Sequence, residues 1–213
     1  MTTVCIIPAR YASMRYPGKP LAELRGATGQ ARSLIERSWR AARNVAGIDA
    51  VYVATDDARI RAAAEGFGAR VLMTSEVCRN GTERCAEAHA ALGGSYDIVV
   101  NLQGDAPLTP HWFVEGLVQG LKDNPDAEIA TPVLRCDGAT LNSLLGDRKA
   151  GRVGGTTAVF RADNQALYFS KEVVPYTGKP YAETDMTPVF HHVGVYAYRP
   201  DALARYPSWP VGP

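Results

Sequence analysis

Three basic residues, Arg10, Arg15 and Lys19, follow directly on an apolar run, and no acidic residue lies between positions 6 and 20. The run, residues 4–9, has the aliphatic character of a strand that is covered on both faces. Ligands of open α/β sheets bind beyond the carboxyl ends of the strands, so these cations are predicted at such a site. Arginine offers phosphate oxygens a planar fork and lysine a point charge, which suits a polyphosphate. A solvated basic loop is the alternative, because neither glycine-rich phosphate-binding fingerprint is present.

A second chemical signal is the segment "VVNLQGDAP", an apolar run that ends in Gln103, Gly104 and Asp105. A single carboxylate at a strand end can hold Mg²⁺, which takes one or two carboxylates and completes its shell with water and phosphate oxygens. The alternative is a turn that Asp105 merely caps. Together, the cations and this carboxylate favour a nucleoside-triphosphate site over either motif alone.

Predicted strands and helices, which must position these residues, alternate along the first part of the sequence. Apolar runs of strand length occupy residues 4–9, 50–56, 69–74, 97–105, 128–134, 156–163 and 191–199. Helical patterns lie between them, over residues 32–46, 82–92 and 110–123. This alternation, which persists to about residue 125, predicts an α/β fold, with a Rossmann-like, mostly parallel, mixed sheet flanked by helices.

We expect residues 1–213 to form one domain with two parts. Residues 1–125 would bind the nucleotide, and residues 126–213 would be β-rich. The least regular segment is 135–155, which is rich in glycine and is expected to lack regular structure.

Composition limits the possible partners. Twenty-three Lys and Arg residues against 22 Asp and Glu give a net charge of +1, which argues against a general nucleic-acid-binding surface. The 4 cysteines form no C-x-x-C pair and are expected to be reduced. No apolar run approaches the length of a membrane span, and no signal-like segment opens the chain. These features predict a cytoplasmic protein that contacts neither nucleic acid nor membrane.

Five segments occur in an order and spacing that resemble the 3-deoxy-manno-octulosonate (Kdo) cytidylyltransferase family. They are "IPARYASMRYPGKPL", "NGTER", "NLQGDAP", "ALYFSKEVVPY" and "HHVGVYAYRP". The resemblance covers nearly the whole chain and implies a fold like that of nucleotide-diphospho-sugar transferases. It also implies a Mg²⁺-dependent reaction of CTP with Kdo that gives CMP-Kdo and diphosphate for lipopolysaccharide biosynthesis.

The resemblance also implies roles for individual residues. The triphosphate would be held by Arg10 and Lys19, with Ser13 and Arg15 lining the same loop. The cytosine would be read by Arg84, the metal held by Asp105, and substrate contacted by Gln103, His192 and Tyr196. These cations would then lack protein partners because the substrate supplies the anions. Residues 126–213 would bind the sugar and form a homodimer.

From the residues alone, other interpretations remain open for two of these positions, and a third residue of the quoted segments is expected to be structural. Arg84 could be a helix-surface arginine paired with Glu83 or Glu87. His192 could be a structural histidine on a strand, and Tyr168 of "ALYFS" is expected in the core.

Some positions depart from the family pattern. Ala106 stands where a glutamate is usual, His191 where a cation is usual, and Asn80 where a serine is usual. The resemblance further implies that family members continue beyond residue 213 with more sugar contacts and a second metal ligand. We therefore expect either that this chain is a fragment or that its function is weakened or lost. The alternatives are a cytidylyltransferase for another acid sugar, such as a nonulosonic acid, and a catalytically impaired nucleotide-binding domain.

Overall fold

The structure is a computed structural model that describes residues 1–12 and 16–210. The chain divides into two compact units, which are described separately. The first comprises Met1–Ala130 and Val195–Pro213, and the second comprises Thr131–Gly194.

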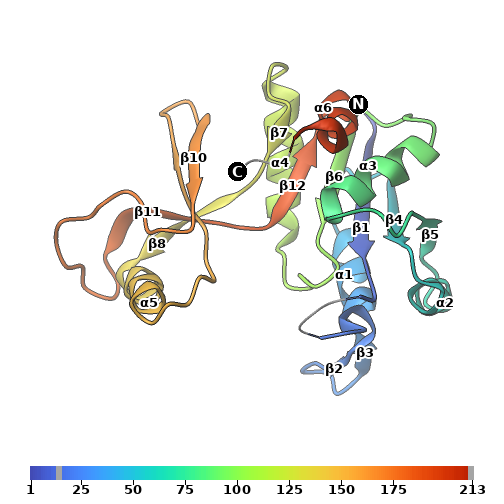
Figure 1. The fold of residues 1–213 in the computed structure, drawn as a ribbon, viewed down its shortest axis with the longest axis horizontal. Coiled ribbons are helices and arrows are strands. Elements are labelled where there is room, and N and C mark those ends of the chain that lie inside the picture. The colour runs from blue at the N-terminus through green and yellow to red at the C-terminus, as the bar shows by residue number, and fades with distance from the viewer. Residues whose placement is uncertain (13–15, 211–213) are drawn as a thin grey trace. The chain divides into compact units, whose positions relative to one another are not determined.

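A six-stranded mixed sheet forms the centre of the first unit (Figure 1). Its strand order is β5-β4-β1-β6-β12-β7, in which β5, β4, β1 and β6 are parallel and β12 runs antiparallel to both its neighbours. The bounds are β1 (Thr3–Ala9), β4 (Ala50–Thr55), β5 (Arg70–Met73), β6 (Ile98–Leu102), β7 (Ile129–Ala130) and β12 (Val195–Tyr198). The predicted mixed α/β sheet is therefore confirmed.

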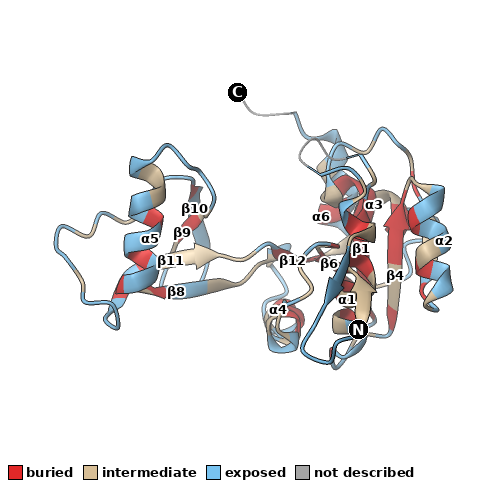
Figure 2. Ribbon diagram, turned by 90° about the horizontal axis from the view of Figure 1, so that it is seen from below, coloured by how far each residue is buried: buried red, intermediate tan, exposed pale blue. Residues whose placement is uncertain are grey.

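Helices cover both faces of this sheet, which is why every residue of β1 is buried. Figure 2 shows α3 and α6 on one side and α1 and α4 on the other. The helices are α1 (Leu34–Arg43), α2 (Ala58–Gly66), α3 (Gly81–Ala91), α4 (His111–Asp123) and α6 (Pro200–Arg205). The smaller elements are the hairpin β2 (Glu23–Arg25) and β3 (Ala31–Ser33) and the 3₁₀ turns η1 (Lys19–Leu21) and η2 (Tyr206–Ser208).

The first helix shows how the sequence pattern becomes structure. The side chain of Ser33 caps α1 by accepting a hydrogen bond from the amide of Glu36 at 3.3 Å. Ile35 and Trp39, four residues apart and so on the same face of this helix, are buried. The helix is shorter than expected and ends at Arg43.

The second unit is a four-stranded antiparallel sheet with one helix. The order is β10-β9-β11-β8. The bounds are β8 (Val133–Asp137), α5 (Gly138–Lys149), β9 (Thr157–Phe160), β10 (Ala166–Ser170) and β11 (Met186–His192). Its core contains Cys136, Leu141, Leu144 and Val189.

The helix α5 corrects the expectation that residues 135–155 lack regular structure. Asp137 caps this helix through a bond from the amide of Thr140 to its carboxylate at 2.8 Å, and Leu141 and Leu144 anchor the helix in the core. Its first residue is glycine because a Cβ there would lie 2.0 Å from the carbonyl oxygen of Ala182. The glycine that suggested irregularity is required by packing.

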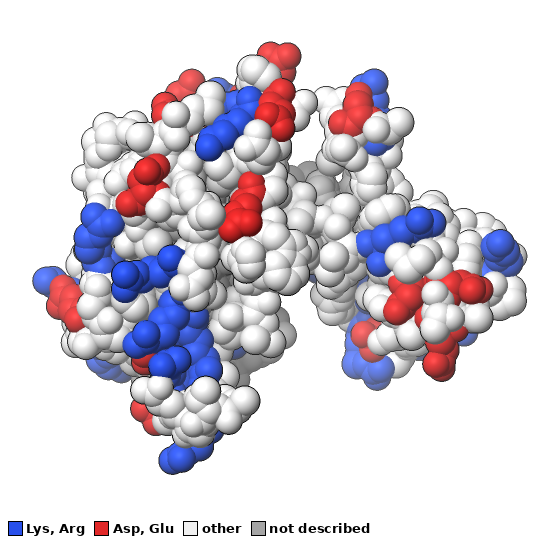
Figure 3. Space-filling model, turned by 180° about the vertical axis from the view of Figure 1, so that it is seen from behind, with Lys and Arg blue, Asp and Glu red and all other residues white. Residues whose placement is uncertain are grey.

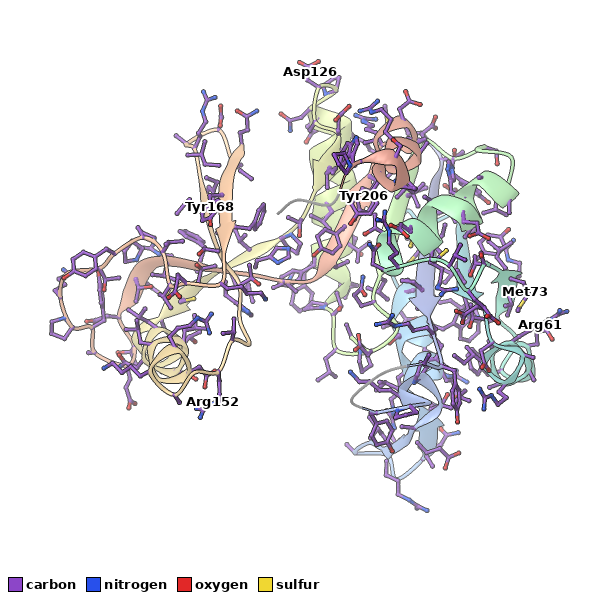
Figure 4. The ribbon with its side chains drawn as sticks, viewed as in Figure 1. Arg61, Met73, Asp126, Arg152, Tyr168 and Tyr206 are labelled. Carbon is purple, nitrogen blue, oxygen red and sulfur yellow. The ribbon has the colours of Figure 1, made fainter. Side chains whose placement is uncertain are left out.

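The expectation that Tyr168 lies in the core is also wrong. Tyr168 is on β10, labelled in Figure 4, and 61% of its surface is exposed. The strand is at the edge of its sheet, so it has only one neighbouring strand to pack against.

None of the helices in the described ranges is long and apolar enough to cross a lipid bilayer. Acidic and basic side chains both occur on each unit in the face shown in Figure 3.

Candidate active site

A cavity of about 690 Å³ opens in the first unit, where β1 and β6 end. Side chains and backbone from three places line it: the segment after β1, the segment before α3 with its first turn, and the segment after β6. The lining residues are Pro8, Ala9, Arg10, Tyr16, Lys19, Pro20, Cys78, Arg79, Asn80, Gly81, Arg84, Gln103, Gly104 and Asp105.

Lys19 and Asp105 form an ion pair at this cavity. Nζ of Lys19 lies 2.6 Å from Oδ2 of Asp105, and the two side chains are 46% and 47% exposed. The expectation that the cations lack protein partners is thus wrong for Lys19. Its partner lies 86 residues away along the chain, beyond the reach of any local charge pattern. An ion pair this exposed contributes little stability, so a bound phosphate can replace it at small cost.

Close packing brings the end of β6 against the end of β1. A Cβ at Gly104 would lie 2.9 Å from the carbonyl oxygen of Pro8, so a side chain there would force the two segments apart. The hydroxyl of Ser38, on α1, donates to the carbonyl of Gly104 at 2.9 Å. These contacts hold Asp105 at the cavity beside the segment that carries Arg10, which is exposed.

Arg84 lines the cavity from the first part of α3 and is buried. Its Nη2 donates to Oδ2 of Asp56 at 2.8 Å, and its Nη1 donates to the hydroxyl of Thr74. The alternative of a helix-surface arginine paired with Glu83 or Glu87 is therefore wrong.

Arg79 is a cavity residue that the sequence analysis missed. Its Nε donates to Oε1 of Glu83 at 2.6 Å, and its backbone amide donates to Oε2 at 2.7 Å. The Arg79 hydrogen bonds hold the pKa of Glu83 below its usual value. The sequence feature that could have identified Arg79 as a site residue is its position directly before the "NGTER" motif.

Asn80 is the N-cap of α3, and its side-chain oxygen accepts bonds from the amides of Thr82 and Glu83, each at 3.0 Å. Its side-chain nitrogen donates to the hydroxyl of Tyr206 at 3.4 Å; Tyr206, labelled in Figure 4, follows α6. The cap is therefore supplied by Asn80 rather than by Thr82, the residue at which the helix was expected to begin. It fixes the helix start that lines the cavity.

Two further lining residues have defined partners. The side-chain nitrogen Nε2 of Gln103 donates to Oδ1 of Asn101 at 2.8 Å, which fixes the orientation of the Gln103 side chain. The thiol of Cys78 donates to Oε2 of Glu87 at 3.1 Å. Burial, reinforced by this hydrogen bond, raises the pKa of Cys78 to about 11, so the thiol is protonated near neutral pH.

Five of the predicted site residues thus meet at one cavity: Arg10, Lys19, Arg84, Gln103 and Asp105. The predicted residues Ser13 and Arg15 lie outside the described residues. Tyr196 is on β12, outside the residues that line the cavity, and its ring centroid lies 6.0 Å from that of Tyr198. Burial raises the pKa of Tyr196.

His192 ends β11 in the second unit. Its Nε2 lies 2.8 Å from the hydroxyl of Thr131, and its ring packs edge-on against Phe169 with centroids 5.1 Å apart. Burial lowers the pKa values of His191 and His192, and Lys171 contributes in the same direction to both. Both histidines are therefore neutral near pH 7.

The donor set at the cavity fits a magnesium ion that arrives with a nucleotide. Within residues 1–12 and 16–210, no group of three or more His, Cys, Asp or Glu side chains could by itself enclose a metal ion. Asp105 instead offers one half-exposed carboxylate at a cavity lined by cations. Mg²⁺ is commonly held in this way, by one or two carboxylates together with substrate phosphates and water.

Comparison with known proteins gives concordant matches. A family model described as Cytidylyltransferase matches residues 4–211. A 3-deoxy-manno-octulosonate cytidylyltransferase from Maricaulis maris is 43% identical over 203 residues, which are 95% of this chain and 75% of the relative. One from Parabacteroides distasonis is 38% identical and is matched over 80% of its length by 99% of this chain.

Solved structures agree with these matches. A CMP:2-keto-3-deoxy-manno-octonic acid synthetase complexed with CTP superposes with a TM-score of 0.83 at 34% identity, over 100% of this chain and 80% of that chain. A cytidylyltransferase from Leptospira borgpetersenii, at 17% identity and a TM-score of 0.59, shares the fold over 66% of its own length.

Proposed function

Since the chain belongs to the 3-deoxy-manno-octulosonate cytidylyltransferase family, we propose that it joins CTP to Kdo and releases diphosphate. The observation that carries this proposal is the meeting of Lys19, Arg84 and Asp105 at one cavity. These three residues come from separate parts of the chain, and each belongs to a segment that resembles the family.

The proposed reaction is an in-line attack of the sugar's anomeric hydroxyl on the α-phosphorus of CTP. Positioning and neutralisation of charge supply most of the catalysis in phosphoryl and nucleotidyl transfer. Arg10 and Lys19 bind the triphosphate and stabilise the charge that develops on the leaving diphosphate. Arg84 binds the base at another part of the cavity, and Gln103 contacts the substrate.

Asp105 would hold the magnesium ion. When bound, the ion supplies positive charge that neutralises the phosphate oxygens. Asp105 then leaves its ion pair with Lys19, and the lysine can turn to the phosphates. The exposure of this pair supports such an exchange.

A diphosphate-release assay with Kdo and each of CTP, UTP, ATP and GTP tests the proposal. We expect turnover with CTP in the presence of Mg²⁺. Turnover confined to another nucleotide rejects it. Calorimetric titration with CTP and Mg²⁺ tests the alternative of a catalytically impaired nucleotide-binding domain. Such a domain would bind CTP but show no turnover with any sugar acid.

The sugar specificity is the finer part of the proposal. We assign His192 and Tyr196 to the binding of an acid sugar, on the strength of the family resemblance. A neutral histidine at position 191, where the family usually has a cation, reduces the attraction for a carboxylate near pH 7. Assays with Kdo and with a nonulosonic acid distinguish the two substrate classes.

We also propose that the protein is a cytoplasmic homodimer. Strand β10 supports self-association, because it is an edge strand and exposes Leu167, Tyr168 and Phe169. Cell fractionation tests the location.

A further inference from the structure

The guanidinium of Arg84 is held at two points. Its side chain is buried, with 2% of the residue exposed, although it lines the cavity. Nη2 donates to the carboxylate of Asp56 at 2.8 Å, and Nη1 donates to the hydroxyl of Thr74. Because both terminal nitrogens are bonded to fixed groups, the plane of the guanidinium is set before any ligand binds.

The two anchoring residues lie side by side at the end of the sheet. Asp56 follows β4 and Thr74 follows β5, and the last residues of these parallel strands, Thr55 and Met73, are register partners. The amide of Thr74 also donates to the carbonyl of Thr55 at 2.9 Å. Neither anchor is among the residues that line the cavity, so both act on a ligand through Arg84.

The acids nearest to Arg84 along the helix are engaged elsewhere. Glu83 is paired with Arg79. Glu87 accepts a bond from the amide of Ser75 at 2.7 Å and another from the thiol of Cys78. The ion pair of Arg84 within the described part of the chain is therefore the one with Asp56.

This pairing determines what Arg84 can bind. Asp56 compensates the positive charge of the guanidinium, which reduces its attraction for a second anion and leaves its N–H donors for a neutral acceptor. A guanidinium carries donors only. Cytosine presents two adjacent acceptors, O2 and N3, whereas uracil carries an N–H donor at position 3. A guanidinium held in one orientation can therefore donate to O2 and N3 of cytosine. It disfavours uracil, because a buried N–H of Arg84 would then face the N–H at position 3 of the base.

We propose that Asp56 and Thr74 are positioning residues that set the base specificity of the cavity by fixing Arg84. This inference rests on the proposed function and adds two residues outside the cavity to it. Thr74 contributes through its hydroxyl and Asp56 through both its charge and its acceptor oxygen.

The matched variants Thr74→Val and Thr74→Ser test the hydroxyl, since valine keeps the shape of threonine and serine keeps its oxygen. Binding of CTP and of UTP is measured by calorimetry with Mg²⁺ and without sugar, and kcat and KM are measured for each substrate. Thr74→Val is expected to weaken CTP binding about tenfold, the effect of one lost bond to a charged group, and to narrow the preference for CTP over UTP. Thr74→Ser is expected to keep wild-type values, and KM for the sugar is expected to change in neither variant.

Asp56→Asn tests the charge, with Asp57→Asn as its control. Asp57→Asn makes the same change in net charge one residue further along the chain. The carboxylate of Asp57, however, binds Arg59 and caps α2 and does not contact Arg84 in the ion pair described above. We expect Asp56→Asn to lower the CTP preference more than Thr74→Val, and Asp57→Asn to leave it unchanged. Thermal unfolding by circular dichroism identifies any variant that does not fold, and the Thr74 pair decides the test if Asp56→Asn fails to fold.

The outcomes are distinct. A wild-type preference for CTP that persists in folded Thr74→Val and Asp56→Asn overturns this inference and leaves the proposed function standing. Equal losses in Thr74→Val and Thr74→Ser overturn it as well, because the hydroxyl would then not matter. A wild-type protein that binds no CTP overturns both.

Discussion

The ion pair of Lys19 and Asp105 is the contact on which the proposed chemistry depends most directly. It joins the residue proposed to bind phosphate to the residue proposed to hold the metal ion. In the absence of a ligand, each charge neutralises the other. With a nucleotide and a metal ion, each would have a new partner of opposite charge, so the pair holds two binding groups in place without burying them.

Lys19→Gln and Asp105→Asn are each expected to lower kcat/KM for CTP by about 10²-fold or more, since each removes a charge that faces the triphosphate or its metal ion. The two residues are in contact, so the double variant is expected to lose less than the product of the single losses. Steady-state kinetics in a double-mutant cycle measure this coupling.

The control is Lys122→Gln, which removes an exposed lysine of α4. Its kcat/KM is expected to equal that of the wild type. Losses that multiply exactly in the double variant would contradict a functional link between Lys19 and Asp105.

At the scale of elements, the start of α3 is a critical part of the site. Its N-cap, Asn80, fixes the first turn, and Gly81 allows that turn to approach Pro8, whose Cγ would lie 3.1 Å from a Cβ at this position. The same helix carries Arg84 into the cavity. A change in the cap therefore acts on both stability and binding.

Asn80→Ala is expected to destabilise the protein by about 1 kcal/mol, because two helix amides lose their acceptor. Asn80→Ser is expected to remain within a few tenths of wild type, because serine is an equally good cap. Urea unfolding followed by circular dichroism compares the midpoints. Equal midpoints for Asn80→Ala and wild type would show that the cap is not needed.

The second unit is expected to lose stability in mild acid. Burial lowers the folded-state pKa values of His191 and His192 below the ordinary value of 6.5. Below pH 6.5 the unfolded chain therefore binds more protons than the folded one, and the free energy of unfolding falls as the pH decreases. The stabilisation is complete above this pH.

Thermal unfolding measured between pH 8 and pH 5 checks this dependence. His192→Gln is expected to flatten the fall, whereas His111→Gln, a change at an exposed histidine of α4, is expected to keep it. A midpoint that does not change over this range in the wild type would rule out the effect of the buried histidines.

On the scale of the whole molecule, the chain does not finish one unit before it starts the next. It leaves the first unit after Ala130, forms the second, and returns at Val195. The return is fixed by β12, which inserts between β6 and β7 and completes the mixed sheet. A division of the chain at one point would separate β12 from the sheet to which it belongs.

Charged substitutions on the exposed edge strand β10 test the proposed homodimer. A variant with Leu167→Lys and Tyr168→Lys is expected to shift the protein to monomers, because lysine on an edge strand opposes pairing with another strand. Sedimentation velocity over a range of concentrations measures the change. The control is Tyr176→Lys, in a loop of the same unit with 93% of the tyrosine exposed. A wild-type protein that is monomeric at every concentration would refute the dimer.

The sequence by itself determined the central sheet and the family. Mostly aliphatic runs become β1, β4 and β6, because a strand covered on both faces is apolar at most of its positions. The basic segment after β1 and the Gln-Gly-Asp segment after β6 predicted the position of the cavity, because the end of a strand is a local feature of the sequence.

Only the tertiary structure decided which charges meet. Asp56 pairs with Arg84 and Asp105 with Lys19 across 28 and 86 residues of chain, while acids closer to Arg84 pair with other groups. It also made a helix of residues 138–149, where the glycines suggest a loop, because a capping aspartate and two buried leucines outweigh them. The two ion pairs share one physical reason. Local patterns record what a segment can bury, whereas the choice of partner depends on which strand ends the fold places together.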